Sequence, residues 1–439
     1  MLGDNLHTET YLNPFVIITL ILLCIAVLII ERKHTVLLLI FIVMFIPNAQ
    51  RIVLGGIDFT MLRLLIIVAW IRFFLKNEVH CIQFITLDYL LIVWAMSTTI
   101  IYSIQQASVS ALVNRLGTSF DALGVYFFIR VSIRSIEDAV HLLRNIGILS
   151  IILACFFLFE DITKINLFGS LGGVPSVSGI WNGLSRSQGA FSHPILAGVY
   201  SAALLPYGIY FTFSNKKDKL PGILFVLSLL LIIFSTKSST AFIGTLIALS
   251  GMLLYRFRSH MRVFRWLVFI TIAGLEIVMT HHVWHLINRV SVRGGATGWH
   301  RYILIQRAFT SFDEWWLLGT RNIDHWNIWA NDITNHYILE GIRGGALTLL
   351  LFILLIVFAY KAVGKTMQKI KNDKENAMLI WSLGVSIAVH MFNFIGVSYF
   401  DQTIAGWYLS LALISSCFHI ENTDELYLQK ISTSSMKTG

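Results

Sequence analysis

The chain has 439 residues, of which 56% are hydrophobic and only 13% are charged. A soluble protein of this length has about a quarter of its residues charged, so the composition excludes an ordinary soluble enzyme and, with a mean hydropathy of +0.73, predicts a membrane protein. The formal net charge of +9 does not call for a nucleic-acid partner, because membrane topology explains most of it.

Apolar runs recur along nearly the whole chain, and they are continuous rather than alternating. Such runs predict membrane-crossing helices and not a β-barrel. We predict an all-α polytopic membrane helix bundle of about 12 to 13 spans, forming a single integral membrane domain over 1–439. The acidic start shows no signal-peptide pattern, so the first span is expected to remain. The expected spans are 13–30, 35–50, 59–75, 86–104, 113–130, 139–159, 194–213, 221–235, 239–255, 263–280, 337–360, 377–395 and 399–419.

The distribution of Lys and Arg predicts the orientation. With the N-terminus outside, the connections on the cytoplasmic side carry 21 basic residues and those on the opposite side carry 10. This excess follows the positive-inside rule. It places two long polar segments on the outer side of the membrane. They are a Gly/Ser-rich loop at 160–193 and a large, partly helical loop at 281–336, which is expected to fold onto the bundle.

Several kinds of chemistry find no support in the residues. The four cysteines are scattered, which predicts neither a disulfide framework nor a thiolate metal site. His281 and His285 stand at i, i+4 as in zinc sites, but no further ligand follows at metal-site spacing, so we expect no metal and no cofactor. Walker, nucleophile-elbow and dinucleotide motifs are absent. Chemistry on the outer face would then need a substrate that is already activated, such as a lipid diphosphate.

Arginines and tryptophans gather in the large loop. Arginine presents a planar fork that suits phosphate oxygens, so these arginines, with Arg186 and Lys237, predict a pocket for a phosphorylated or otherwise anionic substrate. For any single arginine, pairing with a nearby carboxylate or exposure to solvent stays open. Six of the twelve tryptophans, Trp299 among them, lie here too. Tryptophan favours the membrane–water interface, so this is the default explanation. The alternative is that these rings form a platform for the apolar face of a sugar. The loop arginines are Arg289, Arg293, Arg301, Arg307 and Arg321.

The segment DITNHYILEGIRGG (332–345) holds the most distinctive histidine. His336 has Asp332 at i−4 and Glu340 at i+4, so the three share a face if the helix begins near residue 332. A carboxylate beside a histidine raises its basicity, as a general base requires. Alternatively, Asp332 caps the helix, with Asn335 at the third position. The glycines of GIRGG are expected to bend the backbone, and His193 before Pro194 is expected to cap a span.

Four segments in a fixed order resemble the O-antigen ligase and O-antigen polymerase superfamily of bacterial membrane glycosyltransferases. The resemblance covers about 186–360, whereas the preceding residues match only as apolar spans. The segments are RSQGAFSHPILAG (186–198), FSTKSSTAFIG (234–244), RGGATGWHRYILIQRAF (293–309) with WWLLGT (315–320), and DITNHYILEGIRGGALTLLLF (332–352).

The resemblance implies glycosyl transfer from undecaprenyl diphosphate to an acceptor hydroxyl at the periplasmic face, without a metal and with inversion. It implies that Arg186 holds the diphosphate, that Arg301 is the loop arginine before a short amphipathic helix, and that His336 orients or activates the acceptor. The predicted substrate-binding set also contains Arg293, Lys237, Asp332 and Trp299.

Two departures from the family pattern bear on the reaction. Lys237 with two serines stands where many members have Ser-Arg, and His336-Tyr337 replaces the His-Asn pair of ligases. The second departure favours a polymerase of exopolysaccharide or O-antigen repeat units over a ligase that acts on lipid A core. A transporter or flippase of a lipid-linked or anionic amphiphile stays open. The expected partners are an undecaprenyl-diphosphate-linked glycan, an acceptor glycan or lipid A core, membrane lipids and, as a further candidate, a chain-length regulator, with no nucleic acid.

Overall fold

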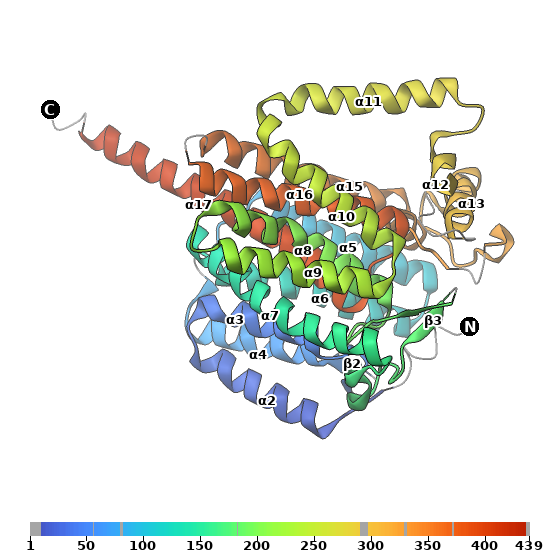
Figure 1. The fold of residues 1–439 in the computed structure, drawn as a ribbon, viewed down its shortest axis with the longest axis horizontal. Helices are drawn as coiled ribbons and strands as arrows, with labels where there is room; N and C mark the ends of the chain where they lie inside the picture. The colour runs from blue at the N-terminus through green and yellow to red at the C-terminus, as the bar shows by residue number, and fades with distance from the viewer. Residues whose placement is uncertain are drawn as a thin grey trace.

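The computed structural model describes residues 10–55, 57–79, 82–181, 183–289, 297–328, 332–370 and 373–435, with the side chains of 289, 297 and 421–435 left aside. Helices dominate this part of the chain, and each predicted span coincides with one of them (Figure 1). The first six are α2 (Pro14–Ile29), α3 (Arg32–Phe45), α4 (Met61–Leu75), α5 (Thr86–Gln106), α6 (Val109–Ser132) and α7 (Ile136–Thr163). The others are α8 (Pro194–Ser214), α9 (Lys219–Thr236), α10 (Ser239–Leu253), α11 (Met261–Val278), α15 (His336–Lys369), α16 (Lys374–Gly396) and α17 (Asp401–Ser435).

The helices confirm a multi-pass membrane bundle. Among the described residues, seven helices are long and apolar enough to cross a membrane: α5, α7, α8, α9, α15, α16 and the Asp401–Ile420 part of α17. Four of the other predicted spans form helices of 14 to 16 residues. At 1.5 Å per residue these are shorter than a hydrocarbon core of about 30 Å. The two that remain, α6 and α11, are long enough, but each contains three charged residues.

Polar residues at the helix starts explain where the helices begin. Asn13 accepts a hydrogen bond from the Phe15 amide at 2.9 Å and precedes Pro14, the first residue of α2. His193 caps α8 in the same way, since its Nδ1 accepts the Ile195 amide at 3.1 Å. The cap predicted at His193 is therefore confirmed. Such caps satisfy amide groups that have no partner within the helix.

Helix α8 lies at the centre of the bundle, with α9, α10, α16 and α17 packed around it (Figure 1). In its apolar segment, 89% of the residues are buried inside the structure, which is the highest fraction among the seven helices. Small residues allow this close packing: a Cβ on Gly222 of α9 would lie 2.3 Å from the Thr212 amide nitrogen. A larger side chain there would push α9 away from α8.

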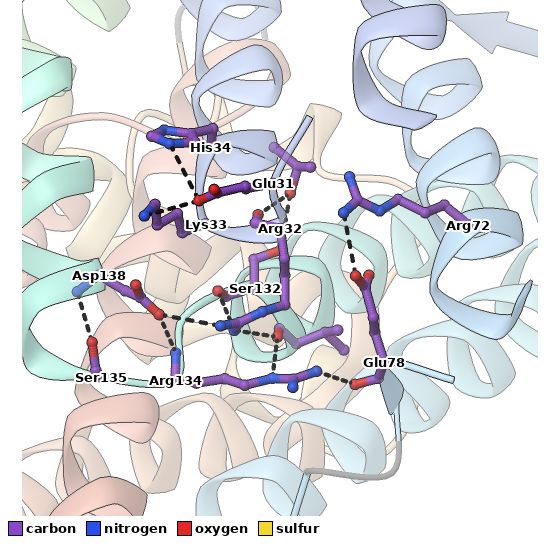
Figure 2. A network of polar contacts seen from close by, with 12 residues as sticks. Glu31, Arg32, Lys33, His34, Arg72, Glu78, Ser132, Arg134, Ser135 and Asp138 are labelled. Atoms are coloured by element: carbon purple, nitrogen blue, oxygen red, sulfur yellow. Dashed lines mark hydrogen bonds and ion pairs between the residues drawn. The ribbon is translucent and has the colours of Figure 1, made fainter. Parts of the chain in front are cut away.

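The connections predicted to share the cytoplasmic side do lie together. Arg32, after α2, pairs with Asp138 at 3.5 Å, and Arg72, at the end of α4, pairs with Glu78 at 3.2 Å (Figure 2). Arg134, between α6 and α7, donates a hydrogen bond to the carbonyl of Glu78. These three connections thus lie at one end of the bundle, as expected, while the side of the membrane on which this end lies remains a prediction from charge.

At the opposite end, the connections between helices fold into small ordered units. Residues Arg51–Leu54 (β1) and Ile57–Thr60 (β2) form one antiparallel hairpin, and Gly179–Trp181 (β3) and Leu184–Arg186 (β4) form another within the Gly/Ser-rich loop. The loop also contains a 3-10 helix, η2 (Leu167–Leu171). Glu160 at the end of α7 anchors this loop, because its carboxylate accepts the amides of Gln188 and Gly189.

The large loop carries its own small hydrophobic core. Its elements are η4 (Val283–His285), α12 (Leu286–Arg289), α13 (Thr297–Thr310), α14 (Phe312–Trp315) and η5 (Asp324–Trp326). Ile342 of α15 joins this core, which fixes the loop to the bundle. The buried side chains of the core are those of Leu304, Ala308, Trp315, Ile323, Trp326, Ile328 and Ile342.

Helix α11 leads to the large loop and lies apart from the other helices (Figure 1). It contacts η3 (Leu254–His260) before it and η4 after it, and none of its residues is buried. Its apolar side chains are therefore exposed around the whole helix, as in a span surrounded by lipid.

Candidate functional site

The segment 332–345 contains the start of α15. The helix begins at His336, and Asn335 caps it by accepting the Ile338 amide at 3.1 Å. Neither alternative considered for Asp332 holds: the helix does not begin near residue 332, and Asp332 is not its cap. The predicted span at 337–360 does begin within one residue of the helix. The short amide side chain of Asn335 reaches the third amide of the helix, which leaves Asp332 outside it. Of the two carboxylates predicted to accompany His336, Glu340 shares its helical face and Asp332 does not.

His336 is buried among aromatic rings. The residue is 4% exposed, and its ring stacks on Phe394 with the centroids 4.8 Å apart. Its Nδ1 accepts a hydrogen bond from the Tyr399 amide at 3.2 Å, so the neutral ring carries its proton on Nε2. That nitrogen lies 3.9 Å from Oε1 of Glu340. In this tautomer neither ring nitrogen offers a lone pair to a substrate, which favours orientation of an acceptor over direct proton abstraction by His336.

Glu340 joins His336 to a positively charged group of side chains. Its other carboxylate oxygen accepts a hydrogen bond from the Trp94 indole at 2.9 Å. Arg343 and Arg115 both act electrostatically on Glu340. Two guanidinium groups thus accompany one carboxylate, and this excess of positive charge attracts an anion. Sequence reasoning missed Trp94 and Arg115, although an arginine within the predicted span 113–130 is itself a signal of function.

The turn between α9 and α10 joins the two motif arginines. Arg186, at the end of β4, donates a hydrogen bond from Nε to the carbonyl of Thr236 at 2.9 Å. Arg301, on α13, donates from Nη2 to the hydroxyl of Thr240 at 2.8 Å. Residues that are 115 positions apart in the chain therefore meet one turn of five residues, 236–240. Thr240 was not singled out from the sequence, because a hydroxyl in a Ser/Thr-rich turn has no distinctive pattern.

Arg301 is a half-buried cation with Asp332 as its neighbour. Burial lowers the pKa of Arg301, and the negative charge of Asp332 opposes this shift. Burial likewise raises the pKa of Asp332, against the effects of His300 and Arg301. Among the described residues, no carboxylate lies within ion-pair distance of the Arg301 guanidinium. The site therefore favours a bound anion beside Arg301.

The turn at 396–400 connects Arg301 with His336. A Cβ on Gly396 would lie 3.5 Å from the Arg301 guanidinium carbon. Asn335, the cap of α15, donates to the carbonyl of Ile395 at 3.3 Å, and the Tyr399 amide contacts His336. The structure thus gathers Arg186, Arg301, Asp332 and His336 at the same end of the bundle.

The other predicted binding residues differ in their surroundings. Lys237 pairs with Asp161 at 3.3 Å, so its charge is partly compensated. Trp299 lies on α13 and is 51% exposed, with its ring 5.4 Å from that of Tyr302. It therefore remains a candidate platform for a sugar. Arg293 lies outside the described residues.

The loop tryptophans do not share one role. Trp315 and Trp326 are 6% and 1% exposed and belong to the core of the loop. Their indoles are therefore unavailable as sugar platforms in this structure. Trp316 is 48% exposed and remains a second candidate.

The GIRGG segment bends the backbone as predicted. Gly345 has φ 67° and ψ −174° and interrupts α15. This break leaves the Ala346 amide and the Ile342 carbonyl without partners inside the helix, and the large loop supplies them. The Ala346 amide donates to the Trp316 carbonyl at 2.7 Å, and the Ile342 carbonyl accepts the Thr320 amide at 2.9 Å. The break therefore fixes the large loop to the helix that begins with His336.

A metal site is a poor fit to these residues. His281 and His285 face each other with ring centroids 4.8 Å apart. Within the part of the chain that the structure describes, no group of three or more His, Cys, Asp or Glu side chains is placed to hold a metal ion.

No protein-family model matches the chain, and no curated protein matches it closely enough to name a relative. A functional assignment therefore depends on the chemistry of the site.

Proposed function

We propose that the protein is a metal-independent membrane glycosyltransferase of the O-antigen ligase and polymerase type. In this proposal it polymerises lipid-linked oligosaccharide repeat units by transfer from undecaprenyl diphosphate at the periplasmic face of a bacterial inner membrane. The observation that carries the proposal is the meeting of Arg186 and Arg301 at the turn 236–240. Arg301 is half-buried and forms no ion pair with a carboxylate among the described residues. Such an arginine suits a diphosphate, whose oxygens accept bidentate hydrogen bonds.

The proposed reaction is a single displacement. The acceptor hydroxyl oxygen bonds to the anomeric carbon of the donor, while the bond from that carbon to the diphosphate oxygen breaks. Arg186 and Arg301 stabilise the negative charge that develops on the leaving undecaprenyl diphosphate. The hydroxyl proton passes to the carboxylate of Glu340, while His336 beside it orients the acceptor. Since the diphosphate is already a good leaving group, the reaction needs no nucleotide.

The choice of polymerase over ligase follows from Tyr337. This residue stands where ligases carry Asn, and its hydroxyl donates to the Met391 carbonyl at 3.1 Å. Tyr337 thus packs α15 against α16 and offers no amide to an acceptor. Both activities share the donor chemistry proposed above.

A transport function is the second candidate, and one observation favours it. His390 lies 1% exposed inside the bundle, where Nδ1 contacts the Tyr399 hydroxyl at 3.1 Å and Nε2 contacts Ser410 at 3.3 Å. Ser410 in turn contacts Tyr207 and Ser386, each at 3.2 Å. Polar chains of this kind within a membrane often mark a pathway.

Deletion of the gene, followed by analysis of the cell-surface glycan, separates these functions. If the protein is a polymerase, the deletion strain should carry surface glycans of single repeat units. If it is a ligase, the deletion strain should contain lipid-linked polymer, with no polymer attached to lipid A. A flippase predicts repeat units that stay on the cytoplasmic side, and an unaltered surface glycan contradicts all three.

Variants on one helix test the arginine assignment. We expect Arg301→Ala to abolish polymer formation, and Arg301→Lys to restore it poorly, because lysine cannot form the bidentate contact. Arg307→Ala is the matched control, since Arg307 is exposed on the same α13. Polymer of wild-type length and amount from Arg301→Ala, at normal protein level, would contradict the assignment. His336→Ala should lose product by the same assay.

A further inference from the structure

Two arginines inside the bundle lack a direct carboxylate partner. Arg115, on α6, is 8% exposed, and its buried Nε has no hydrogen-bond partner in the described part of the chain. Arg343, on α15, is half-buried. Neither guanidinium lies within ion-pair distance of a described carboxylate. A charged group inside a membrane bundle is costly and is retained where it has a function, so these two arginines indicate a ligand.

The two arginines belong to one cluster that four helices build. The Arg115 guanidinium lies 4.3 Å from the centre of the Tyr102 ring on α5. Arg343 follows Glu340 by one turn of α15, and Arg115, Glu340 and Tyr102 all act on it electrostatically. Tyr408 of α17 is 4% exposed and interacts electrostatically with both Arg115 and Glu340. Each of these helices packs on its neighbours in the cluster.

The charges within this cluster do not balance. The two guanidinium groups share the single carboxylate of Glu340, so an excess of one positive charge remains. Asp121, also on α6, does not remove it, because Arg63 already holds that carboxylate with two hydrogen bonds, at 2.8 and 2.7 Å. One further carboxylate would neutralise the cluster. A diphosphate carries more than one negative charge and would leave it negative, which is unfavourable inside the bundle.

Glu340 connects this cluster with the proposed reaction site. Its Oε1 lies 3.9 Å from Nε2 of His336, the histidine that orients the acceptor, and its Oε2 accepts the Trp94 indole. Glu340 is also the group that takes the proton of the acceptor hydroxyl in the proposed reaction. A ligand group held by Arg115 and Arg343 would therefore lie beside that hydroxyl, on the same sugar or on the next one.

The burial of Arg115 favours a ligand that enters the bundle over a membrane lipid. An arginine that reaches for lipid phosphates extends its guanidinium to the membrane surface, where it is exposed. Arg115 is instead buried, and its guanidinium packs on the ring of Tyr102. A sugar carboxylate suits this position, because its two oxygens accept the paired hydrogen bonds that an arginine offers.

We propose that Arg115 and Arg343 bind the carboxylate of an acidic sugar in the acceptor glycan. The substrate class is then a repeat unit that contains a hexuronic acid or another sugar with one carboxylate. A neutral sugar is rejected, because it leaves the two buried cations without a partner. The identification of this sugar as the acceptor rests on the proposed function, whereas the binding of an acidic sugar does not.

The test uses the full chain in lipid nanodiscs and two forms of one probe. The first form is the single repeat unit of the host's surface glycan, released by mild acid so that it carries neither lipid nor diphosphate. In the second form, carbodiimide activation and borohydride have reduced its carboxyl groups to alcohols. Saturation-transfer NMR measures the dissociation constant of each form, and inorganic phosphate serves as a competitor.

We expect the wild-type protein to bind the acidic form about tenfold more tightly than the reduced form, as charged hydrogen bonds imply. Arg115→Gln and Arg343→Gln should each abolish this preference. Arg307→Gln is the matched control and should keep it, because Arg307 is exposed on α13. The comparison of the two forms on wild-type protein needs no variant, so it decides the question if the variants fail to fold.

Three results would overturn the acidic-sugar site. They are a repeat unit without a carboxylate, equal binding of the two forms by the wild-type protein, and a preference that persists in folded Arg115→Gln and Arg343→Gln. Inorganic phosphate that displaces the acidic form at equal or lower concentration would also overturn it, since the site would then be one for phosphate.

Failure of this inference differs from failure of the proposed function. A surface glycan that is unaltered by deletion of the gene contradicts the glycosyltransferase, and a preference for the acidic form then leaves the sugar site standing. Loss of polymer in the deletion strain, without any preference between the two forms, supports the proposed function and overturns the site.

Discussion

Replacement of Gly345 by alanine tests the break in α15, which joins the large loop to the helix of His336. The backbone there has φ 67° and ψ −174°, a region that non-glycine residues occupy at a cost of about 1–3 kcal/mol. An added Cβ would also lie 2.4 Å from the Leu317 carbonyl oxygen and 3.0 Å from that of Trp316. These are backbone atoms, so they cannot rotate away as a side chain would.

Relief of this overlap requires the loop to move and the hydrogen bond from the Ala346 amide to the Trp316 carbonyl to break. Such a bond contributes about 1 kcal/mol, so we expect Gly345→Ala to lower the free energy of unfolding by about 3 kcal/mol. That corresponds to a factor of about 150 in the unfolding equilibrium. Titration with SDS in mixed micelles, followed by circular dichroism, measures it.

Gly364→Ala is the matched control on the same helix. A Cβ at Gly364 meets no atom within 4 Å, and φ is not positive there. Alanine at a helical glycine stabilises by up to about 1 kcal/mol, so the two variants should shift stability in opposite directions. A loss below about 1 kcal/mol for Gly345→Ala would refute the reasoning, because it would mean that the break forms without a glycine.

Two further predictions concern charge. Asp88→Asn should cost about 3–5 kcal/mol in the same SDS titration, because it strips the partner from Arg130 inside the bundle, where the pair is 3.0 Å apart and both side chains are at most 2% exposed. Asp58→Asn, in a pair with a half-exposed carboxylate, should cost under about 1 kcal/mol, and equal losses would contradict this account. Burial acts to raise the pKa of Glu314, but hydrogen bonds from Trp326 and its neighbouring histidine lower it overall. This stabilisation of the loop is present above the unfolded value of 4.5 and is lost as the pH falls below it. The acid-induced change in tryptophan fluorescence should therefore disappear in Glu314→Gln, and its persistence would show another origin.

Much of the bundle was predictable from hydropathy and charge. Each span rests on a local excess of apolar residues, and the alternation of basic connections orders them, so the helices and their neighbours at each end follow. The cap at His193 and the bend at Gly345 were also predictable, because both depend on the conformational preferences of single residues.

The surroundings of the candidate site residues were not predictable in the same way. The span at 337–360 was placed within one residue of the observed start of α15, but its cap was left open, because Asp332 and Asn335 are both good caps and only the fold selects Asn335. Two loop tryptophans that suited a sugar platform are instead part of the loop core. Their burial depends on Ile342 of α15 and on Leu304 of α13, and spacing along the loop does not reveal these contacts.

The sequence by itself determined that the chain is a helical membrane protein, where its helices lie and which connections share an end. These properties follow from local interactions between side chains and lipid or water. Only the tertiary structure decided that Arg186 and Arg301 meet the turn 236–240, that Tyr399 sets the tautomer of His336, and that Asp401 accepts hydrogen bonds from Ser192 and Asn48. These contacts join residues from 50 to 353 positions apart, and only the packing of the helices brings such distant residues within hydrogen-bond distance.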